Sequence, residues 1–258
     1  MNKSPFQSAL AALALVALVA LLAGCYPRGD AGVPIPHALV PAPVKATRLV
    51  VVLPGRGDDL AAMQRTGMAE AIQAAWPDAD VILTGLALDY YDEGRAPQRL
   101  RDEIVAPARR YGHREAWLVG ASMGGMGTIM YDQAYPGEMD GLILLAPYLG
   151  EEPLLGEIQA AGGLAKWEPG PPAGISRENF QRELWRHMRS WVSDRERARD
   201  IWLAYGDRDR LKAAMPLLAP ALDPDQVLVR KGGHDWKVWS SVTAEILTRI
   251  DEQRAAAP

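Results

Sequence analysis

Residues 118–127 read LVGASMGGMG, and this stretch decides the fold expected for the chain of 258 residues. An apolar run leads into a glycine-rich turn that contains one serine, Ser122. Such a turn after a strand can cradle phosphate groups, hold a nucleophile on a tight bend, or simply let a helix pack closely on a sheet. A phosphate loop is disfavoured, because the spacing matches neither G-x-x-x-x-G-K-[ST] nor G-x-G-x-x-G and no lysine follows.

The segment Gly120-Ala121-Ser122-Met123-Gly124 fits the pattern G-x-S-x-G of a nucleophile elbow. In an elbow the serine sits on a strained bend between a strand and a helix, so the residues two before and two after it must be small. The surrounding sequence supplies both elements, since a buried strand is predicted before the serine and a helix after it. Ser122 is therefore predicted to be a nucleophile.

Strands and helices alternate along most of the chain on both sides of this turn. Short β-branched runs predict strands buried on both faces of a parallel sheet, and apolar residues at helical spacing predict helices between them. Strands are expected at 47–54, 80–86, 115–122, 140–147, 201–206 and 226–233, and helices at 58–77, 97–112, 124–135, 210–220 and 236–253. This order predicts an α/β fold with a doubly wound, mostly parallel sheet.

The alternation breaks at residues 148–200, where no strand is predicted. A short helix is expected at 153–162 and a Gly/Pro-rich loop at 168–174. A second helix, opened by Ser176, carries an apolar stripe formed by Phe180, Leu184, Met188 and Trp191. A helical insertion at this point predicts a cap over the site, and an extra packed layer with no gating role is the alternative.

The first 24 residues resemble a secretory signal peptide. Lys3 supplies a positive charge, and the apolar segment at 9–24 is shorter than the roughly 20 residues of a membrane span. The segment ends LAGC, which resembles a bacterial lipobox and implies that Cys25, the only cysteine, is lipid-modified after cleavage. Tyr26, rather than Asp, then implies a lipid-anchored protein of the Gram-negative outer membrane, facing the periplasm. An uncleaved anchor with an incidental cysteine is the alternative.

Residues 25–46 are rich in proline and alanine, and we expect a semi-rigid tether without regular structure there. The folded domain is expected to span residues 47–258. Its composition, with 48% apolar and 23% charged residues over the whole chain, is that of an ordinary globular protein. A net charge of −4 with interspersed signs gives no electrostatic basis for nucleic-acid binding.

A serine hydroxyl needs a base, and the chain has four histidines. His37 falls in the expected tether, His113 in a charged turn and His187 in the insertion. His234 follows the last predicted strand in GGHDWKVW, where two glycines allow the backbone to turn sharply toward the sheet. His234 is therefore the predicted base.

An acid that orients this histidine is expected between the serine and the histidine in chain order. The stretch YGDRDRL follows the strand at 201–206 and offers Asp207 and Asp209. The pattern Gly-x-x-Asp, with an apolar residue two further on, selects Asp209, and Asp207 is the alternative.

An oxyanion hole needs two N–H donors near the nucleophile. Met123, directly after the serine, supplies one. The loop LPGRGDD after the first strand offers the N–H of Arg56, whose side chain could also attract an anionic substrate group. A Pro-Gly turn with surface charges is the alternative for this loop.

These elements together resemble the α/β-hydrolase superfamily over residues 47–253. GGHDWKVW is also similar to the Gly-x-His-x-Trp-x-x-Trp pattern of the esterase D and tributyrin-esterase branch, which implies that Trp236 and Trp239 support the histidine loop and line the substrate pocket. The chain departs from that branch in its oxyanion loop, which lacks His-Gly, and in its insertion.

The resemblance implies a serine hydrolase that cleaves carboxylic esters of small molecules or lipids through an acyl-enzyme. Ser122, Asp209 and His234 would form its triad. No metal or cofactor is expected, because the histidines are scattered and the cysteine is assigned to the lipid. A thioesterase or peptidase on the same scaffold and a non-catalytic envelope binding protein are the alternatives. The sequence does not indicate an oligomeric state.

Overall fold

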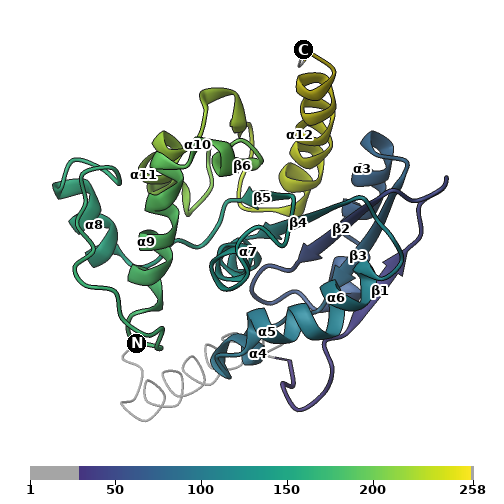
Figure 1. Cartoon of the computed structure of the whole chain (residues 1–258), viewed down its shortest axis with the longest axis horizontal. Coiled ribbons are helices and arrows are strands. Elements are labelled where there is room, and N and C mark those ends of the chain that lie inside the picture. The colour runs from purple at the N-terminus through teal and green to yellow at the C-terminus, as the bar shows by residue number, and fades with distance from the viewer. Residues whose placement is uncertain (1–28, 257–258) are drawn as a thin grey trace, which may run out of the picture.

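The computed structural model describes residues 29–256, so the predicted signal peptide, Cys25 and Tyr26 lie outside the described residues. A seven-stranded sheet with the order β1-β3-β2-β4-β5-β6-β7 runs through the molecule (Figure 1). All neighbouring strands are parallel except β1, which is antiparallel to β3. The strands are β1 (His37–Val40), β2 (Arg48–Leu53), β3 (Ala79–Thr84), β4 (Glu115–Ala121), β5 (Gly141–Leu145), β6 (Ile201–Gly206) and β7 (Val227–Arg230). The predicted doubly wound, mostly parallel fold is confirmed.

Alternate residues of the central strands point to opposite faces of the sheet, as the strand period of two requires. In β2, Val51 and Leu53 enter a core that includes residues of α5 and α7, while Val50 and Val52 enter a second core with α3 and α12. The sheet is therefore covered on both faces, which explains its nearly continuous apolar strands. The longer helices are α3 (Met68–Ala75), α7 (Met123–Ala134), α8 (Glu152–Ala160), α9 (Phe180–Ser193) and α12 (Trp236–Ala256).

Two of the predicted helices are divided. The helix expected at 58–77 is split into α2 (Leu60–Met63) and α3, because Gly67 before α3 has a φ of +72° that ends regular helix geometry. The helix expected at 97–112 contains α5 (Ala96–Leu100), a π-helical turn at Arg101–Val105, and α6 (Ala106–Arg109). Short helices α4 (Leu88–Asp92), α10 (Arg195–Ala198) and α11 (Met215–Leu218) complete the main elements.

The segment expected to be an irregular tether contributes a strand. Residues His37–Val40 form β1 and pair with β3 from Thr84 to Val81. Ile35, just before β1, is 1% exposed and its N–H donates to Glu103 Oε2 at 2.7 Å. Prolines flank β1 without interrupting it, because an edge strand uses only one of its two hydrogen-bonding sides. The prediction that residues 25–46 lack regular structure was therefore wrong for these four residues.

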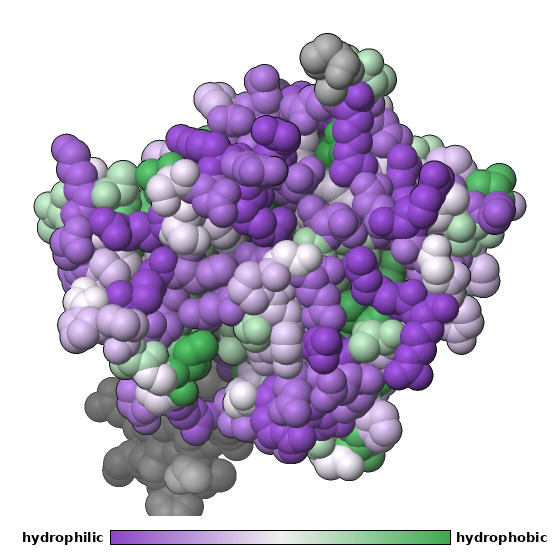
Figure 2. All heavy atoms as spheres, viewed as in Figure 1, coloured by the Kyte–Doolittle hydropathy of each residue, from purple (hydrophilic) through white to green (hydrophobic). Residues whose placement is uncertain are grey.

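The insertion at 148–200 contains α8, α9 and α10 and, among its described residues, no strand. The second helix begins at Phe180 rather than Ser176. Helix α9 packs on α7, with Trp185 Nε1 donating to the carbonyl of Leu149 at 2.6 Å and His187 Nε2 lying 2.8 Å from Asp132 Oδ2. Figure 1 shows α8, α9, α10 and α11 gathered at one side of the sheet. Figure 2 shows a mainly hydrophilic surface on this view, with apolar residues in small separate groups.

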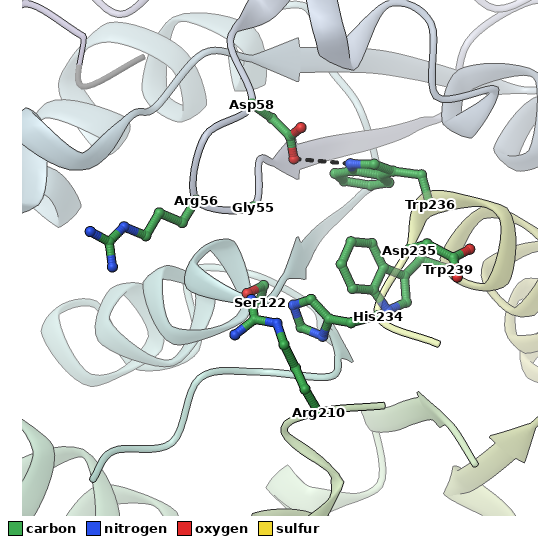
Figure 3. Close-up of a pocket in the computed structure, with 9 residues that line it drawn as sticks. All are labelled: Gly55, Arg56, Asp58, Ser122, Arg210, His234, Asp235, Trp236 and Trp239. Atoms are coloured by element: carbon green, nitrogen blue, oxygen red, sulfur yellow. Dashed lines mark hydrogen bonds between the residues drawn. The ribbon is translucent and has the colours of Figure 1, made fainter. Parts of the chain in front are cut away.

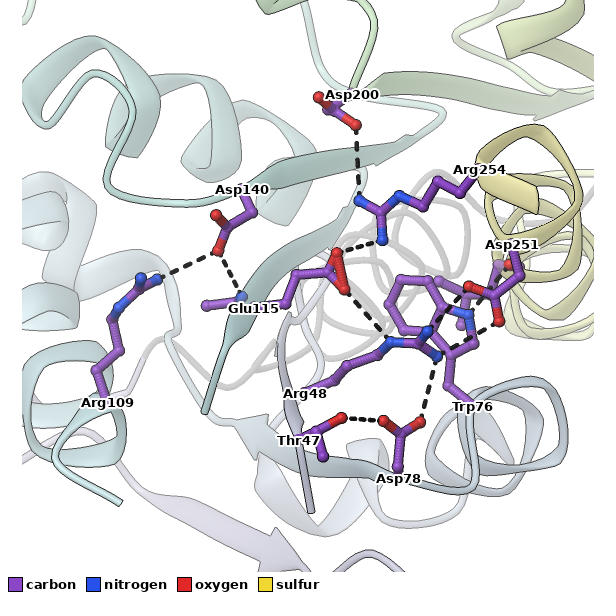
Figure 4. Close-up of polar contacts among 12 residues, drawn as sticks. Thr47, Arg48, Trp76, Asp78, Arg109, Glu115, Asp140, Asp200, Asp251 and Arg254 are labelled. Atoms are coloured by element: carbon purple, nitrogen blue, oxygen red, sulfur yellow. Dashed lines mark hydrogen bonds and ion pairs between the residues drawn. The ribbon is translucent and has the colours of Figure 1, made fainter. Parts of the chain in front are cut away.

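At the amino edge of the sheet, where the parallel strands begin, charged side chains pair with one another (Figure 4). Arg48, at the start of β2, lies 3.2 Å from Asp78, 3.3 Å from Glu115 and 3.0 Å from Asp251. Glu115 also pairs with Arg254 of α12. This network joins the beginnings of β2 and β4 to the end of the last helix. The carboxyl edge, where the strands end, is different and carries the candidate site.

Candidate active site

Ser122 occupies a sharp bend between β4 and α7. Its φ of 54° and ψ of −113° are rare for a residue with a side chain. A Cβ at Gly120 would lie 2.1 Å from the carbonyl oxygen of Gly124, and one at Gly124 would lie 2.5 Å from that of Leu53. The N–H of Ser122 donates to the carbonyl of Leu145 at 2.9 Å, which fixes the bend against β5. The two glycines are thus required for the bend to close.

His234 lies in the loop between β7 and α12, and its Nδ1 is 2.9 Å from both carboxylate oxygens of Asp209. Asp209 is 2% exposed and also accepts from the N–H of Leu211 at 2.8 Å. Asp207 is exposed and instead accepts from the N–H of Gly232 at 2.9 Å, within the loop that carries the histidine. Of the two candidate acids, Asp209 is the partner of the imidazole in this structure.

The second ring nitrogen of His234 differs from Nδ1 in its hydrogen bonding. Nε2 is buried and, within residues 29–256, has no hydrogen-bond partner. A carboxylate only accepts, so the neutral ring donates through Nδ1 and its Nε2 keeps a lone pair. Figure 3 shows the ring pointing toward Ser122, whose side chain is itself 5% exposed. The arrangement leaves one basic nitrogen next to one hydroxyl.

Both residues line a pocket of about 340 Å³ at the carboxyl edge of the sheet, the usual position of ligand sites in open α/β sheets. The described residues that line it come from the loops after β2, β4, β6 and β7 and from the first turn of α12: Gly55, Arg56, Asp58, Ser122, Arg210, His234, Asp235, Trp236 and Trp239 (Figure 3). None of them belongs to the insertion. The insertion thus contributes no residue to the lining of this pocket, and its role as a cap stays a prediction.

Two backbone N–H groups lie beside the serine. Met123 is the first residue of α7, where N–H groups have no partner within the helix. Gly55 brings the loop after β2 close, since a Cβ there would be 3.7 Å from the Cβ of Ser122, and Arg56 follows it. Among the described residues, neither the N–H of Met123 nor that of Arg56 donates to a protein acceptor. Both donors remain available for a ligand oxygen.

Of the two tryptophans predicted to support the histidine loop, Trp239 contacts the ring of His234 and Trp236 contacts Trp239. Trp239 is 3% exposed and meets the ring of His234 edge-on, with centroids 4.7 Å apart. Trp236 meets Trp239 edge-on at 5.1 Å, and its Nε1 donates to Asp58 Oδ2 at 3.0 Å. The tryptophans therefore connect the histidine loop to the loop after β2.

Asp58 was not predicted as a pocket residue. Its neighbour Asp59 caps α2, by accepting from the N–H of Ala62 at 2.7 Å. Burial raises the pKa of Asp58, and the hydrogen bond from Trp236 opposes this effect. Arg210 was also missed, although its position next to Asp209 at the end of β6 was a usable signal.

The other three histidines lie elsewhere. His187 contacts Asp132, which is 2% exposed; burial tends to raise the pKa of Asp132, but the hydrogen bond from His187 and the charge of Arg197 outweigh burial and lower it. His113 Nε2 lies 2.9 Å from Asp80, and His37 Nδ1 lies 3.0 Å from the carbonyl of Ile35. None of the three lines the described pocket.

Within residues 29–256, no group of three or more His, Cys, Asp or Glu side chains is placed to hold a metal ion. No helix in that range combines the length and apolar character needed to cross a membrane.

No family model matches the chain, and no curated protein matches its sequence. Solved structures do match. The chain is similar to fluorophosphonate-binding serine hydrolase F of Staphylococcus aureus (TM-score 0.54, 13% identity, 84% of this chain and 99% of that one). It is also similar to an S-formylglutathione hydrolase of Staphylococcus aureus (0.53, 13%, 80% and 81%) and to Est1E of Butyrivibrio proteoclasticus (0.51, 14%, 89% and 98%). At these identities the similarity concerns the fold, and the chain has the α/β-hydrolase fold.

Proposed function

We propose that this chain is a serine hydrolase that cleaves carboxylic esters through an acyl-enzyme. The observation that carries the proposal is the state of His234: one ring nitrogen is bonded to buried Asp209, and the other is unpartnered and faces Ser122. A histidine held in this way can accept the serine proton as the hydroxyl attacks. Asp209 holds the ring tautomer and stabilises the imidazolium that forms.

The reaction then proceeds in two halves. The Ser122 oxygen adds to the ester carbonyl carbon while His234 takes the hydroxyl proton. The C–O bond to the alcohol breaks, His234 gives that proton to the leaving oxygen, and an acyl-serine remains. Water repeats the sequence and releases the acid. The N–H groups of Met123 and Arg56 are proposed to stabilise the oxyanion, and Trp236 and Trp239 to line the substrate pocket.

The similar structures support an ester as the substrate. Their names include a ferulic acid esterase and a monoacylglycerol lipase from Paleococcus ferrophilus, at 14% identity. We therefore place carboxylic esters, of small molecules or lipids, ahead of thioesters and amides.

The hydrolysis of p-nitrophenyl esters by residues 29–258 tests this function. We expect kcat/KM for p-nitrophenyl butyrate to fall by about 10⁴-fold or more in Ser122→Ala, because the nucleophile is removed. The matched p-nitroanilide and thioester should react more slowly than the ester. Wild-type protein that is folded yet inactive on all three would favour the non-catalytic alternative, and faster cleavage of the anilide or thioester would favour a peptidase or thioesterase.

A separate proposal concerns location. Cys25 is proposed to carry a lipid that anchors the domain to the outer membrane, facing the periplasm, on the basis of the lipobox-like sequence LAGC. Replacing Cys25 with Ser in the full chain should move the protein from the membrane fraction to the soluble fraction of a Gram-negative host. Unchanged membrane association of Cys25→Ser would contradict this proposal without affecting the catalytic one.

A further inference from the structure

Two arginines line the pocket without an ion pair or a side-chain hydrogen bond to any described residue. Arg56 follows Gly55 in the loop after β2, and Arg210 follows Asp209 after β6. Both side chains are exposed, and within residues 29–256 neither guanidinium forms an ion pair or a hydrogen bond. By contrast, Arg208, which does not line the pocket, lies 3.8 Å from Asp207.

The carboxylates of the same pocket are already engaged. Asp235 accepts from the N–H of Val238 at the start of α12, at 3.1 Å. Asp58 accepts from Nε1 of Trp236 at 3.0 Å. Among the pocket-lining residues, the two guanidinium charges are therefore not balanced by a direct ion pair.

The directions of the two side chains differ. In Figure 3 the guanidinium of Arg210 points toward Ser122 and His234, whereas that of Arg56 extends away from the serine. A guanidinium offers a planar fork of donors that matches a carboxylate or phosphate group. Arg210 is thus placed to hold an anionic group close to the reacting ester, and Arg56 to attract such a group from the edge of the pocket.

We propose that the pocket selects esters that carry a second, anionic group, a carboxylate or a phosphate, and that Arg210 is its principal ligand. This inference rests on the proposed serine hydrolase function and adds the class of substrate. The charged ester binds with its anion on Arg210, which leaves the ester carbonyl next to Ser122.

Three pairs of esters test the proposal, and in each pair one member carries an anionic group and the other is neutral. Mono-p-nitrophenyl adipate against p-nitrophenyl hexanoate places a carboxylate on the acyl part. The pair of 4-acetoxybenzoate and its neutral methyl ester places the carboxylate on the alcohol part. The pair of 4-acetoxyphenyl phosphate and the neutral 4-acetoxyphenyl methyl ether places a phosphate there instead. We expect kcat/KM to be about tenfold higher for the charged member of at least one pair, the usual size of one charge-assisted contact.

Arg210→Gln should reduce the charged-to-neutral ratio of kcat/KM at least fivefold, and Arg210→Lys should retain part of it. Arg208→Gln is the matched control and should leave the ratio unchanged, because Arg208 is 79% exposed and lies outside the pocket lining. Equal rates for both members of every pair, or a preference that survives Arg210→Gln, would overturn the proposal. Hydrolysis of p-nitrophenyl hexanoate that depends on Ser122 would show, in that event, that the catalytic function still stands.

Discussion

The charged side chains at the two ends of the parallel strands differ in their ion pairing. At the amino edge, Arg48 contacts three carboxylates, and one of these, Glu115, also pairs with Arg254. At the carboxyl edge, Arg56 and Arg210 have no ion pair within the described chain. Polar groups that stabilise a fold are satisfied by the protein itself, whereas groups that meet a ligand keep unused bonding capacity.

The same contrast separates two histidine–aspartate pairs. His187 and Asp132 lie 2.8 Å apart, and Asp132 also pairs with Arg197, so both oxygens of this carboxylate are used in joining the insertion to α7. His234 and Asp209 lie 2.9 Å apart, yet Nε2 of His234 is unpartnered. The presence of a His–Asp pair is therefore not sufficient to identify a site, and neither is an unpartnered nitrogen, because His113 bonds Asp80 and its Nδ1 is also buried without a partner in the described chain. The distinguishing feature is that the unpartnered nitrogen of His234 lies in the pocket and faces Ser122.

The largest expected effect is that of His234→Ala. Removing the proposed base should lower kcat/KM for p-nitrophenyl butyrate by about 10⁴-fold or more, with the protein still folded by circular dichroism. His187→Ala is the control and should retain the rate per folded molecule, because His187 lies outside the pocket lining. If His187→Ala lost as much activity as His234→Ala, the contrast between the two pairs would fail.

Next in size is the exchange of either acid for its amide. Asp209→Asn should reduce kcat about 10³- to 10⁴-fold, because an amide does not stabilise the imidazolium or hold the productive tautomer. Asp207→Asn should reduce kcat by less than about tenfold, since the side-chain oxygen of the new residue still accepts from the N–H of Gly232. A larger loss at Asp207 would reverse the assignment of the acid.

At the amino edge, Arg48→Ala should lower the free energy of unfolding by about 2 kcal/mol, because Asp78, Glu115 and Asp251 lose their shared cation. The network is partly exposed, so the effect falls below that of a fully buried pair. Urea denaturation measures it, with Arg208→Ala as an exposed control that should change stability by under about 0.5 kcal/mol. The hydrolysis rate per folded molecule should stay unchanged in Arg48→Ala. A large fall in that rate would contradict the assignment of stability to the amino edge and of catalysis to the carboxyl edge.

The smallest effect is a pH dependence of stability. Burial raises the pKa of Asp58, so the folded state binds this proton more tightly than the unfolded state. Stability from this group is therefore fully present below the ordinary Asp pKa of about 3.9 and is lost as pH rises through the raised value. Asp58→Asn removes the titrating carboxyl group and keeps an acceptor for Trp236. Its free energy of unfolding at neutral pH should exceed that of wild type by under about 1 kcal/mol, because solvent screens a half-buried group.

Thermal unfolding from pH 4 to pH 8 compares Asp58→Asn with wild type. The difference in Tm between the two proteins should be smallest at pH 4 and should grow toward neutral pH, with the variant having the higher Tm. A difference that grows in favour of wild type would show that the ionised carboxylate stabilises the fold.

The sequence was sufficient for most of the fold because local signals agreed. The apolar runs of β2 and β4 predict buried strands, and the two glycines around Ser122 require a tight bend directly after β4. Strand β1 was missed because prolines dominate its surroundings, and only its pairing with β3 makes it a strand. The break at Gly67 was missed because apolar spacing continues across it.

The candidate site was predictable where chain order carries information. Ser122, Asp209 and His234 follow strands in the expected order, and the structure brings them to one edge. The place of Asp58 in the pocket depends on how the loop after β2 faces Trp236, and no local pattern encodes that arrangement. For Arg210 the only local signal was its position next to Asp209. The position of the insertion beside α7 likewise follows from packing of Trp185 and its neighbours, which the helical stripe alone does not locate.

The central claim is that the carboxyl edge holds one activated serine, and covalent labelling tests it most directly. Purified protein would be treated with a fluorophosphonate, digested, and the adduct located by peptide mass spectrometry, with Ser122→Ala treated in parallel. We predict a single adduct on the peptide that contains Ser122 and none in the variant. An unlabelled wild type with intact fold, or equal labelling of Ser122→Ala, would contradict the account.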